Sequence, residues 1–454
     1  MTAAQAIDTK QWLADHAQLK AAMAAGYANL DSLKAGRRLD LAAWDRRTLE
    51  ALEQARSDRE AKQALEALLQ AFGDGHLRLL PPAPAALSVE KARPTEPAPQ
   101  SCSDLGYRKA RMRAPALADL DAYTPLGSAD DALFPAGVLR LDAERQLGVI
   151  RIAAFGEDAY LALCERQLPA PKPCDRACAT EVWKGVGREL SEALARQVAA
   201  LQARQVAALL IDLTGNGGGT EWVETAARIV AGPQLASPRL GFVRHPHWVK
   251  RLETRLEALR ADLERPDLAE PLRALLISAQ TQVQAALNQA RQPCDRSGIW
   301  QGEAACESLA SAELFTTGHL AVRPSLDLQG LRSARSLFSP PYAPEPEIGF
   351  RGRLAVLVDR RTASAAEQFA AMLKDGAGAL LLGERTLGAG CGYTAGGIQT
   401  VLSHSGLRLR MPDCARLRKD GSNEVLGVAP DLTLPAQRFD ALQTALTAWL
   451  SESR

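Results

Sequence analysis

The sequence predicts an α/β protein with an N-terminal helical bundle and a helical-hairpin insertion. Three patterns support this: apolar residues at helical spacing near the N-terminus, short apolar strands alternating with helices further on, and a proline-broken helical stretch that interrupts the alternation. The 454 residues exceed the ~250–300 at which one hydrophobic core usually stops growing. We expect a helical bundle at 1–73, a histidine-bearing strand and Pro-rich linker at 74–145, and an α/β core at 146–454 with an insertion at about 233–345.

The bundle rests on apolar residues that recur every three or four positions, first within 12–30 and again within 65–72. Gly73 then ends the last helix. The segment 76–80 (His-Leu-Arg-Leu-Leu) is strand-like. The Pro- and Ala-rich stretch 81–100 favours an extended linker.

Alternating patterns predict the core. The expected strands are 147–152, 206–213, 354–359 and 379–382, and the expected helices are 181–201, 220–230 and 364–374. Residues 102–146 have weak periodicity and give no firm assignment.

The insertion contains a helical pattern over 249–292 that Pro266 and Pro271 interrupt. Because proline breaks a helix, this stretch predicts a helical hairpin. Two interpretations stay open: a packing element of the core, or a lid or docking arm.

Composition excludes several classes of function. A net charge of +1 gives no reason to expect a nucleic-acid partner or an electrostatically bound membrane. No apolar run reaches the ~18 residues of a membrane-spanning helix. The first residues lack a basic start followed by an apolar stretch, so we expect no secretory signal in this chain.

The chain has eight cysteines, and this even count favours disulfides over free thiols. The expected local pairs are Cys174–Cys178, Cys294–Cys306 and Cys391–Cys414, which leaves Cys102 to pair with Cys164. Because disulfides persist in oxidising compartments, we expect a mature periplasmic or secreted protein whose signal was replaced by Met1. Eight ordinary thiols in a cytosolic enzyme remain the alternative.

The first candidate site residue is Ser364, which follows an apolar strand and a polar turn and begins a helix. A hydroxyl at this position lies over free backbone N–H groups, which stabilise developing negative charge. Ser364 with Glu367 three residues later also fits a capping box, and this segment alone favours the cap.

A second strand, 206–213, leads into the Gly-rich turn Thr214-Gly-Asn-Gly-Gly-Gly219. Glycines allow backbone N–H groups to approach an anion. A phosphate loop is the competing interpretation, but no Gly-Lys-Ser/Thr follows. The third candidate is His76 in Gly73-Asp-Gly-His; such a histidine, taken alone, is more often structural.

Five segments in this order resemble the family of tail-specific (C-terminal processing) proteases and tricorn core proteases. They are Asp74-Gly-His76, Asp212-Leu-Thr-Gly-Asn-Gly-Gly-Gly219, Thr362-Ala-Ser-Ala-Ala-Glu367, Gly383-Glu-Arg-Thr-Leu-Gly-Ala-Gly390 and Glu424-Val-Leu-Gly-Val-Ala-Pro-Asp431.

The resemblance implies a crotonase-like core of ββα units and a set of roles. Ser364 would be the nucleophile. The N–H of Ala365, with one from Gly217 or Gly218, would form the oxyanion hole.

The general base separates the branches of this family. The processing branch uses a lysine where this chain has Ala389, which cannot accept a proton. The tricorn branch uses a histidine from the N-terminal part, and His76 occupies that motif. Glu424 matches the acidic member of the tricorn charge network. The resemblance does not require Glu424 to contact His76 directly.

Departures from the family pattern affect this assignment. Gly75 stands where tricorn has a serine, and Thr214 replaces the arginine usual after Asp212-Leu213. The Pro-rich linker lacks the strand pattern and Gly-rich loop of a PDZ module.

The leading hypothesis is therefore a tricorn-like serine endopeptidase with no cofactor or metal, acting on peptides or unfolded protein. Two alternatives stay open: a catalytically silent ligand- or peptide-binding module on the same fold, and an interaction scaffold in which the 249–292 hairpin is the working part. No Gly-x-Ser-x-Gly elbow occurs, which argues against an α/β-hydrolase esterase.

Overall fold

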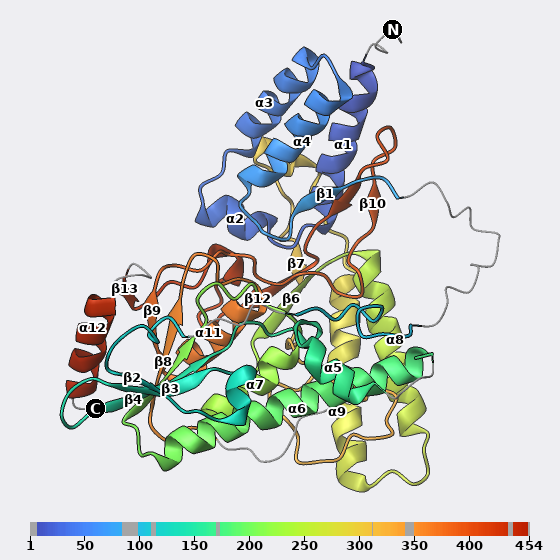
Figure 1. Cartoon of the computed structure of the whole chain (residues 1–454). Coiled ribbons are helices and arrows are strands. Elements are labelled where there is room, and N and C mark those ends of the chain that lie inside the picture. The colour runs from blue at the N-terminus through green and yellow to red at the C-terminus, as the bar shows by residue number, and fades with distance from the viewer. Residues whose placement is uncertain are drawn as a thin grey trace.

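The computed structural model describes residues 7–83, 99–109, 115–168, 173–310, 312–340, 349–434 and 439–452. Most of the predicted Pro-rich linker (84–98) therefore lies outside the described residues. The structure is mixed α/β, as predicted, with a central mixed sheet (Figure 1).

The predicted N-terminal helices are present and pack antiparallel. Asp8, Asp40 and Ser57 each begin a helix by accepting a hydrogen bond from a backbone N–H in its first turn. The helices are α1 (Thr9–Gly26), α2 (Leu30–Gly36), α3 (Leu41–Gln54) and α4 (Asp58–Ala71). The short strand β1 (Arg78–Leu80) follows.

The central sheet has seven strands in the order β13-β9-β8-β5-β4-β3-β2, of which the first five are parallel. The two others pair antiparallel at one edge, β2 with β3 and β3 with β4. Sequence patterns gave no assignment for β2 and β3. The strands are β2 (Tyr123–Pro125), β3 (Ala136–Arg140), β4 (Gln146–Arg151), β5 (Ala208–Asp212), β8 (Arg353–Val358), β9 (Leu380–Gly383) and β13 (Leu432–Thr433).

Helices cover both faces of this sheet, so successive residues of β5 enter different cores. Leu209 and Ile211 pack against helices on one face, and Ala208 and Leu210 pack in the cluster that includes α12. Figure 1 shows α6 running below the sheet and α12 at its left edge. The helices are α5 (Leu161–Gln167), α6 (Arg176–Ala203), α7 (Trp222–Ala231), α11 (Ala365–Ala377) and α12 (Phe439–Ser451).

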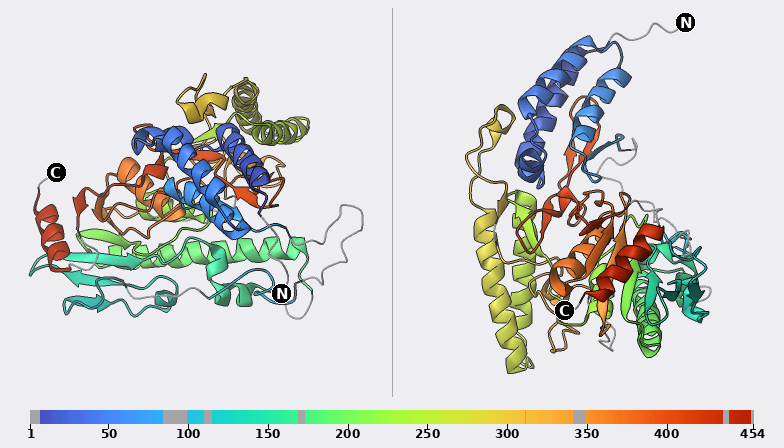
Figure 2. Two further views of the ribbon diagram at one scale, coloured as in Figure 1. Left: turned by 90° about the horizontal axis from the view of Figure 1, so that it is seen from above. Right: turned by 90° about the vertical axis from the view of Figure 1, so that its left-hand side faces the viewer.

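The insertion contains the predicted hairpin, α8 (Pro246–Leu263) and α9 (Glu270–Ala290), whose helices lie side by side in Figure 2. The first helix ends before Pro266, and Pro271 lies in the first turn of the second, where its missing N–H costs nothing.

The insertion also supplies strands that sequence patterns did not predict. Two of them join a second sheet, in the order β12-β6-β7. A third sheet has the order β1-β11-β10. The remaining elements are β6 (Arg239–Val243), β7 (Leu309–Ala310), β10 (Thr400–Val401), β11 (Arg408–Arg410), β12 (Cys414–Leu417), α10 (Ala334–Leu337) and four 3₁₀ turns, η1 (Ala129–Ala132), η2 (Glu157–Ala159), η3 (Ser297–Gln301) and η4 (Glu424–Leu426).

The N-terminal helices, the hairpin and the second sheet share one apolar core. Polar contacts reinforce the junction: Arg296 Nη2 lies 2.6 Å from Asp31 Oδ1, and Asn423 Nδ2 donates to Asn29 Oδ1 at 2.9 Å. The hairpin is thus packed into the molecule, and a role as a lid or docking arm stays a prediction. The division into three domains stays a prediction.

All four predicted disulfides are present: Cys102–Cys164, Cys174–Cys178, Cys294–Cys306 and Cys391–Cys414. The short Cys174–Cys178 bridge is sterically possible because Cys174 precedes the first residue of α6, Arg176. Within the described ranges, none of the helices is both long and apolar enough to cross a membrane.

Candidate active site

The carboxyl end of β8 leads through a tight turn to Ser364, the residue before the first turn of α11. Ser364 has φ 55° and ψ −119°, a conformation that non-glycine residues rarely adopt. Such strain costs on the order of 1–3 kcal/mol and persists only where the surroundings fix it. Here Asp359 Oδ1 accepts from the N–H of Gly215 at 2.9 Å, and the Ala363 N–H donates to Asn216 O at 3.0 Å.

Glu367 connects the serine to the loop that follows β9. Its buried carboxylate accepts the N–H of Ser364 at 2.8 Å, which is one half of the predicted capping box. The same carboxylate accepts four more hydrogen bonds, from Thr386 Oγ1 (2.6 Å) and the N–H groups of Gly388 (2.6 Å), Ala389 (2.9 Å) and Gly390 (3.4 Å). Glu367 therefore fixes the serine and this loop relative to each other.

The Gly-rich turn packs directly against the serine. A Cβ on Gly218, which has φ +100°, would lie 2.8 Å from both Ser364 Cβ and the Ala365 nitrogen, so a side chain does not fit there. The Gly218 N–H donates to Asn216 Oδ1 at 2.8 Å. The N–H groups of Ala365 and Gly217 form no hydrogen bond with any part of the chain that the structure describes. Both N–H groups are therefore available to donate to a bound group.

His76 follows α4, and the buried Asp74 holds its backbone. Asp74 Oδ1 accepts the His76 N–H at 2.9 Å, while Oδ2 accepts from Tyr27 Oη (2.7 Å) and Asn29 Nδ2 (2.9 Å). The imidazole Nδ1 lies 3.0 Å from the carbonyl oxygen of Ala389. Because a carbonyl only accepts, Nδ1 carries the proton and Nε2 keeps a free lone pair.

Burial lowers the pKa of His76 below its ordinary value of 6.5, against the opposing charge of Asp74. The imidazole is therefore neutral at pH 7. Among the described residues no hydrogen bond joins His76 to Ser364. They are linked through Ala389, which donates its N–H to Glu367 and accepts from His76.

Glu424 begins the 3₁₀ turn η4 and does not hydrogen-bond to His76 in the described structure. Its Oε2 accepts from Arg416 Nε at 2.6 Å, and Arg416 Nη2 donates to the carbonyl oxygen of Ser364 at 2.7 Å. Burial raises the pKa of Glu424 to about 7, although the charge of Arg416 opposes that shift. Arg416 was not predicted from the sequence, because no local motif marks it.

Thr214 stands where the family pattern has an arginine, and in the structure an arginine from another strand contacts it. Arg151 of β4 places its Nη1 3.0 Å from Asp212 Oδ2 and 3.0 Å from Thr214 Oγ1, and its Nη2 donates to Thr214 O at 2.7 Å. An arginine from the neighbouring strand thus pairs with Asp212. Elsewhere, His247 Nε2 lies 3.1 Å from Asp413 Oδ2, and no metal-ligand cluster exists among the described residues.

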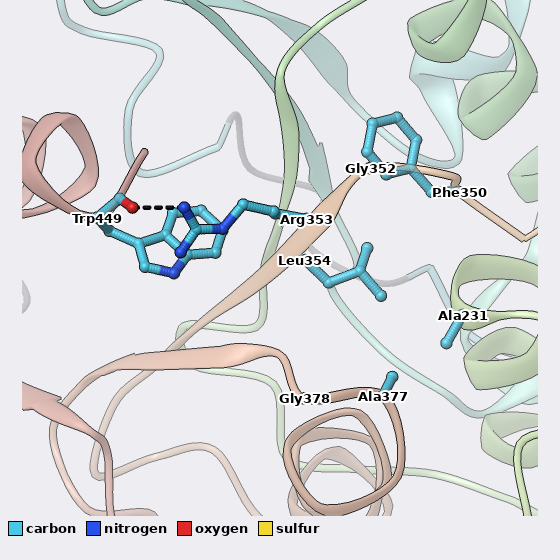
Figure 3. A pocket seen from close by; sticks show the side chains of 8 residues that line it. All are labelled: Ala231, Phe350, Gly352, Arg353, Leu354, Ala377, Gly378 and Trp449. Atoms are coloured by element: carbon cyan, nitrogen blue, oxygen red, sulfur yellow. Dashed lines mark hydrogen bonds between the residues drawn. The ribbon is translucent and has the colours of Figure 1, made fainter. Parts of the chain in front are cut away.

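A cavity of about 260 Å³ lies at the opposite end of β8 from Ser364 (Figure 3). It is lined by Arg353, the first residue of that strand, and by Gly378 after α11. Arg353 stacks 4.1 Å over the ring of Trp449 and donates to its carbonyl oxygen at 2.5 Å. Since six strand residues span about 20 Å, this cavity is separate from the serine.

The chain matches the family model of Peptidase family S41 over residues 146–434, and no curated protein matches it. Mature CPAF in complex with lactacystin is similar at 14% identity and TM-score 0.61, with 98% of this chain and 99% of that chain covered. Mature CPAF alone gives 14% identity and TM-score 0.56 over 98% and 96%. The photosystem II D1 C-terminal processing protease gives 16% identity and TM-score 0.36 over 94% of each chain.

At 14% identity the CPAF structures show a shared fold. The family match covers more than half of the sequence and includes both Ser364 and the Gly-rich turn. The chain therefore belongs to peptidase family S41.

Proposed function

We propose that the protein is a serine endopeptidase of the tricorn-like Ser/His type, built on a crotonase-like core. Ser364 is the nucleophile and His76 the general base. The observation that carries the proposal is the strained backbone of Ser364, held through Glu367 to the loop whose carbonyl orients His76. Backbone strain fixed from several sides is common at catalytic nucleophiles.

In this mechanism His76 Nε2 takes the proton of the Ser364 hydroxyl as the oxygen attacks the substrate carbonyl carbon. The N–H groups of Ala365 and Gly217 stabilise the resulting oxyanion. Because Gly218 has no side chain, the Gly-rich turn can lie close to Ser364. His76 then protonates the departing amine, and a water releases the acyl group by the same steps. Since no hydrogen bond joins His76 and Ser364 in the described structure, substrate binding draws them together or a water bridges them.

Glu424 acts in this proposal through Arg416, without direct contact with His76. The positive charge of Arg416 disfavours a protonated His76. An ionised Glu424 at 2.6 Å partly neutralises that charge and stabilises the imidazolium that forms during acylation.

The substrate in this proposal is a peptide or unfolded protein, and the compartment is periplasmic or extracellular. Four disulfides support the compartment, since such bonds persist where the environment is oxidising.

The test uses a fluorophosphonate probe, which reacts with an activated serine, together with a quenched peptide library. The wild-type protein should be labelled and should cleave peptides, and Ser364→Ala should do neither while its melting temperature stays nearly unchanged. Ser103→Ala is the matched control, because Ser103 is exposed and lies in a turn near Cys102. If the wild-type protein reacts no faster than Ser364→Ala, the alternative of a catalytically silent peptide-binding module gains support.

A further inference from the structure

A second cavity, of about 180 Å³, lies between the loop after Cys391 and the strand β11. Its lining includes Tyr393, Ile398, Arg408 and Arg410. This volume is below the ~300–1,000 Å³ of pockets for drug-sized ligands and suits a single side chain or chain end.

The cavity adjoins the proposed general base. The hydroxyl of Tyr393 donates to the carbonyl oxygen of His76, and the two rings lie 5.5 Å apart, centroid to centroid. A group bound here would therefore lie one side chain away from His76.

The strand register collects positive charge on this side of the sheet. Arg408 and Arg410 are two apart on β11 and face the same way, and Arg78 of β1 pairs directly with Arg410. The residue between them, Leu409, points to the buried face and is 3% exposed. Like charges directly opposite each other destabilise a sheet, so the pairing of Arg78 with Arg410 needs compensation.

The described chain provides little of that compensation. None of the three arginines forms an ion pair with any described residue. Arg408 donates to Pro81 O at 2.9 Å, and Arg410 lies 3.9 Å over the ring of Tyr393. The negative charge of Asp74 also influences Tyr393. The Asp74 carboxylate, however, already accepts hydrogen bonds from Tyr27, Asn29 and the His76 N–H.

We propose that this arginine pocket, lined by Arg408, Arg410 and Tyr393 with Arg78 paired beside Arg410, is a substrate subsite that binds a carboxylate of the peptide. The carboxylate is either an Asp or Glu side chain or the C-terminus of the chain. Arginine suits this role because its planar group pairs with both carboxylate oxygens. The inference rests on the proposed peptidase function.

The experiment first identifies cleavable sequences in a chymotrypsin-derived peptide library with the full-length wild-type protein. Quenched peptides of one cleaved sequence are then made in matched pairs: Glu against Gln near the cleavage site, and a free against an amidated C-terminus. For the wild-type protein, kcat/KM should be about 10-fold higher for the carboxylate member of one pair, the effect typical of one charge-assisted hydrogen bond.

Arg410→Gln and Arg408→Gln should each remove most of this preference, mainly through KM, while cleavage of the neutral peptide persists. Arg46→Gln is the control: it removes the same charge from an exposed position on α3 and should leave the preference intact. The pair that shows the preference identifies the source of the carboxylate.

Equal kcat/KM for both members of both pairs would overturn the inference, as would a preference that survives in both pocket variants. Either result leaves the peptidase proposal standing, because cleavage itself is still observed. Loss of all cleavage in the wild-type protein would instead contradict the proposed function.

Discussion

At the scale of single residues, the orientation of His76 follows from one contact. The carbonyl of Ala389 fixes the proton on Nδ1, and burial keeps the ring neutral at pH 7. Any residue at position 389 would offer the same carbonyl, so the contact depends on the backbone of this loop and not on the alanine side chain. The loop after β9 thus supplies the acceptor that orients the histidine.

His76→Ala should lower kcat by at least about 100-fold, as loss of a general base typically does. His404→Ala is the matched control, since His404 is exposed and its ring stacks edge-on against Trp12. Steady-state cleavage of a quenched peptide measures both. Turnover by His76→Ala near the wild-type rate would exclude the Ser/His assignment.

The pH dependence of kcat/KM should report the same histidine. Because the neutral form acts as base and its pKa is lowered, activity should rise with pH through a midpoint below 6.5. Ionisation of Glu424, whose pKa burial raises to about 7, should add a smaller rise. A lysine base would place the rise several pH units higher. The control is Glu424→Gln, which should keep the acidic limb below 6.5 and lose the smaller rise. Disappearance of that limb in Glu424→Gln would assign it to Glu424.

At the scale of elements, the first turn of α11 holds the site together through Glu367. Its side chain connects the helix, the serine and the loop after β9 with five hydrogen bonds. Every donor is a neutral group that needs an acceptor. The two carboxylate oxygens offer about four lone-pair sites, so the longest contact, from the Gly390 N–H at 3.4 Å, shares one of them. A capping residue therefore also positions the loop that orients His76.

Glu367→Gln should reduce the free energy of unfolding by about 3 kcal/mol, because its NH₂ group would face at least two donors and leave them unsatisfied. Urea unfolding followed by circular dichroism measures this. The control is Glu384→Gln in the same loop, which removes only an ion pair with the exposed Arg360 and should change the free energy by less than about 1 kcal/mol. Equal losses in the two variants would show that the Glu367 contacts add no stability.

Sequence patterns predicted those elements whose signals are local. The strands at β5 and β8 and the helices α6 to α9 have long, regular apolar spacing, and they are confirmed. The second sheet was missed because its strands are short and pair across long distances in the chain, as Phe242 does with Cys414. Arg416 and Tyr393 were missed for the same reason, since only the fold brings them beside Ser364 and His76.

At the scale of the whole molecule, the site depends on segments far apart in sequence, and one disulfide joins two of them. Cys391 lies in the loop that contacts His76, where a Cβ on Gly392 would be 3.8 Å from the imidazole Nε2. Cys414 begins β12, the strand that carries Arg416. Cys294–Cys306, by contrast, closes a half-buried loop in the insertion.

Purified protein, denatured without reductant, should show no free thiols, and eight should appear after reduction. Thiol titration with a chromogenic disulfide measures this. Eight thiols before reduction would refute the disulfides and favour the cytosolic alternative.

Two double variants should separate stability from activity. Cys391→Ala with Cys414→Ala opens a bridge of sequence separation 23, and Cys294→Ala with Cys306→Ala opens one of 12. Because loop-closure entropy depends weakly on length, each pair should lose about 3 kcal/mol of stability, measured by urea unfolding. Only the first pair should also lose peptide turnover at a temperature where both are folded, since only that bridge ties the His76 loop to the Arg416 strand. Equal relative turnover in the two variants would show that the bridge stabilises the fold without positioning the site.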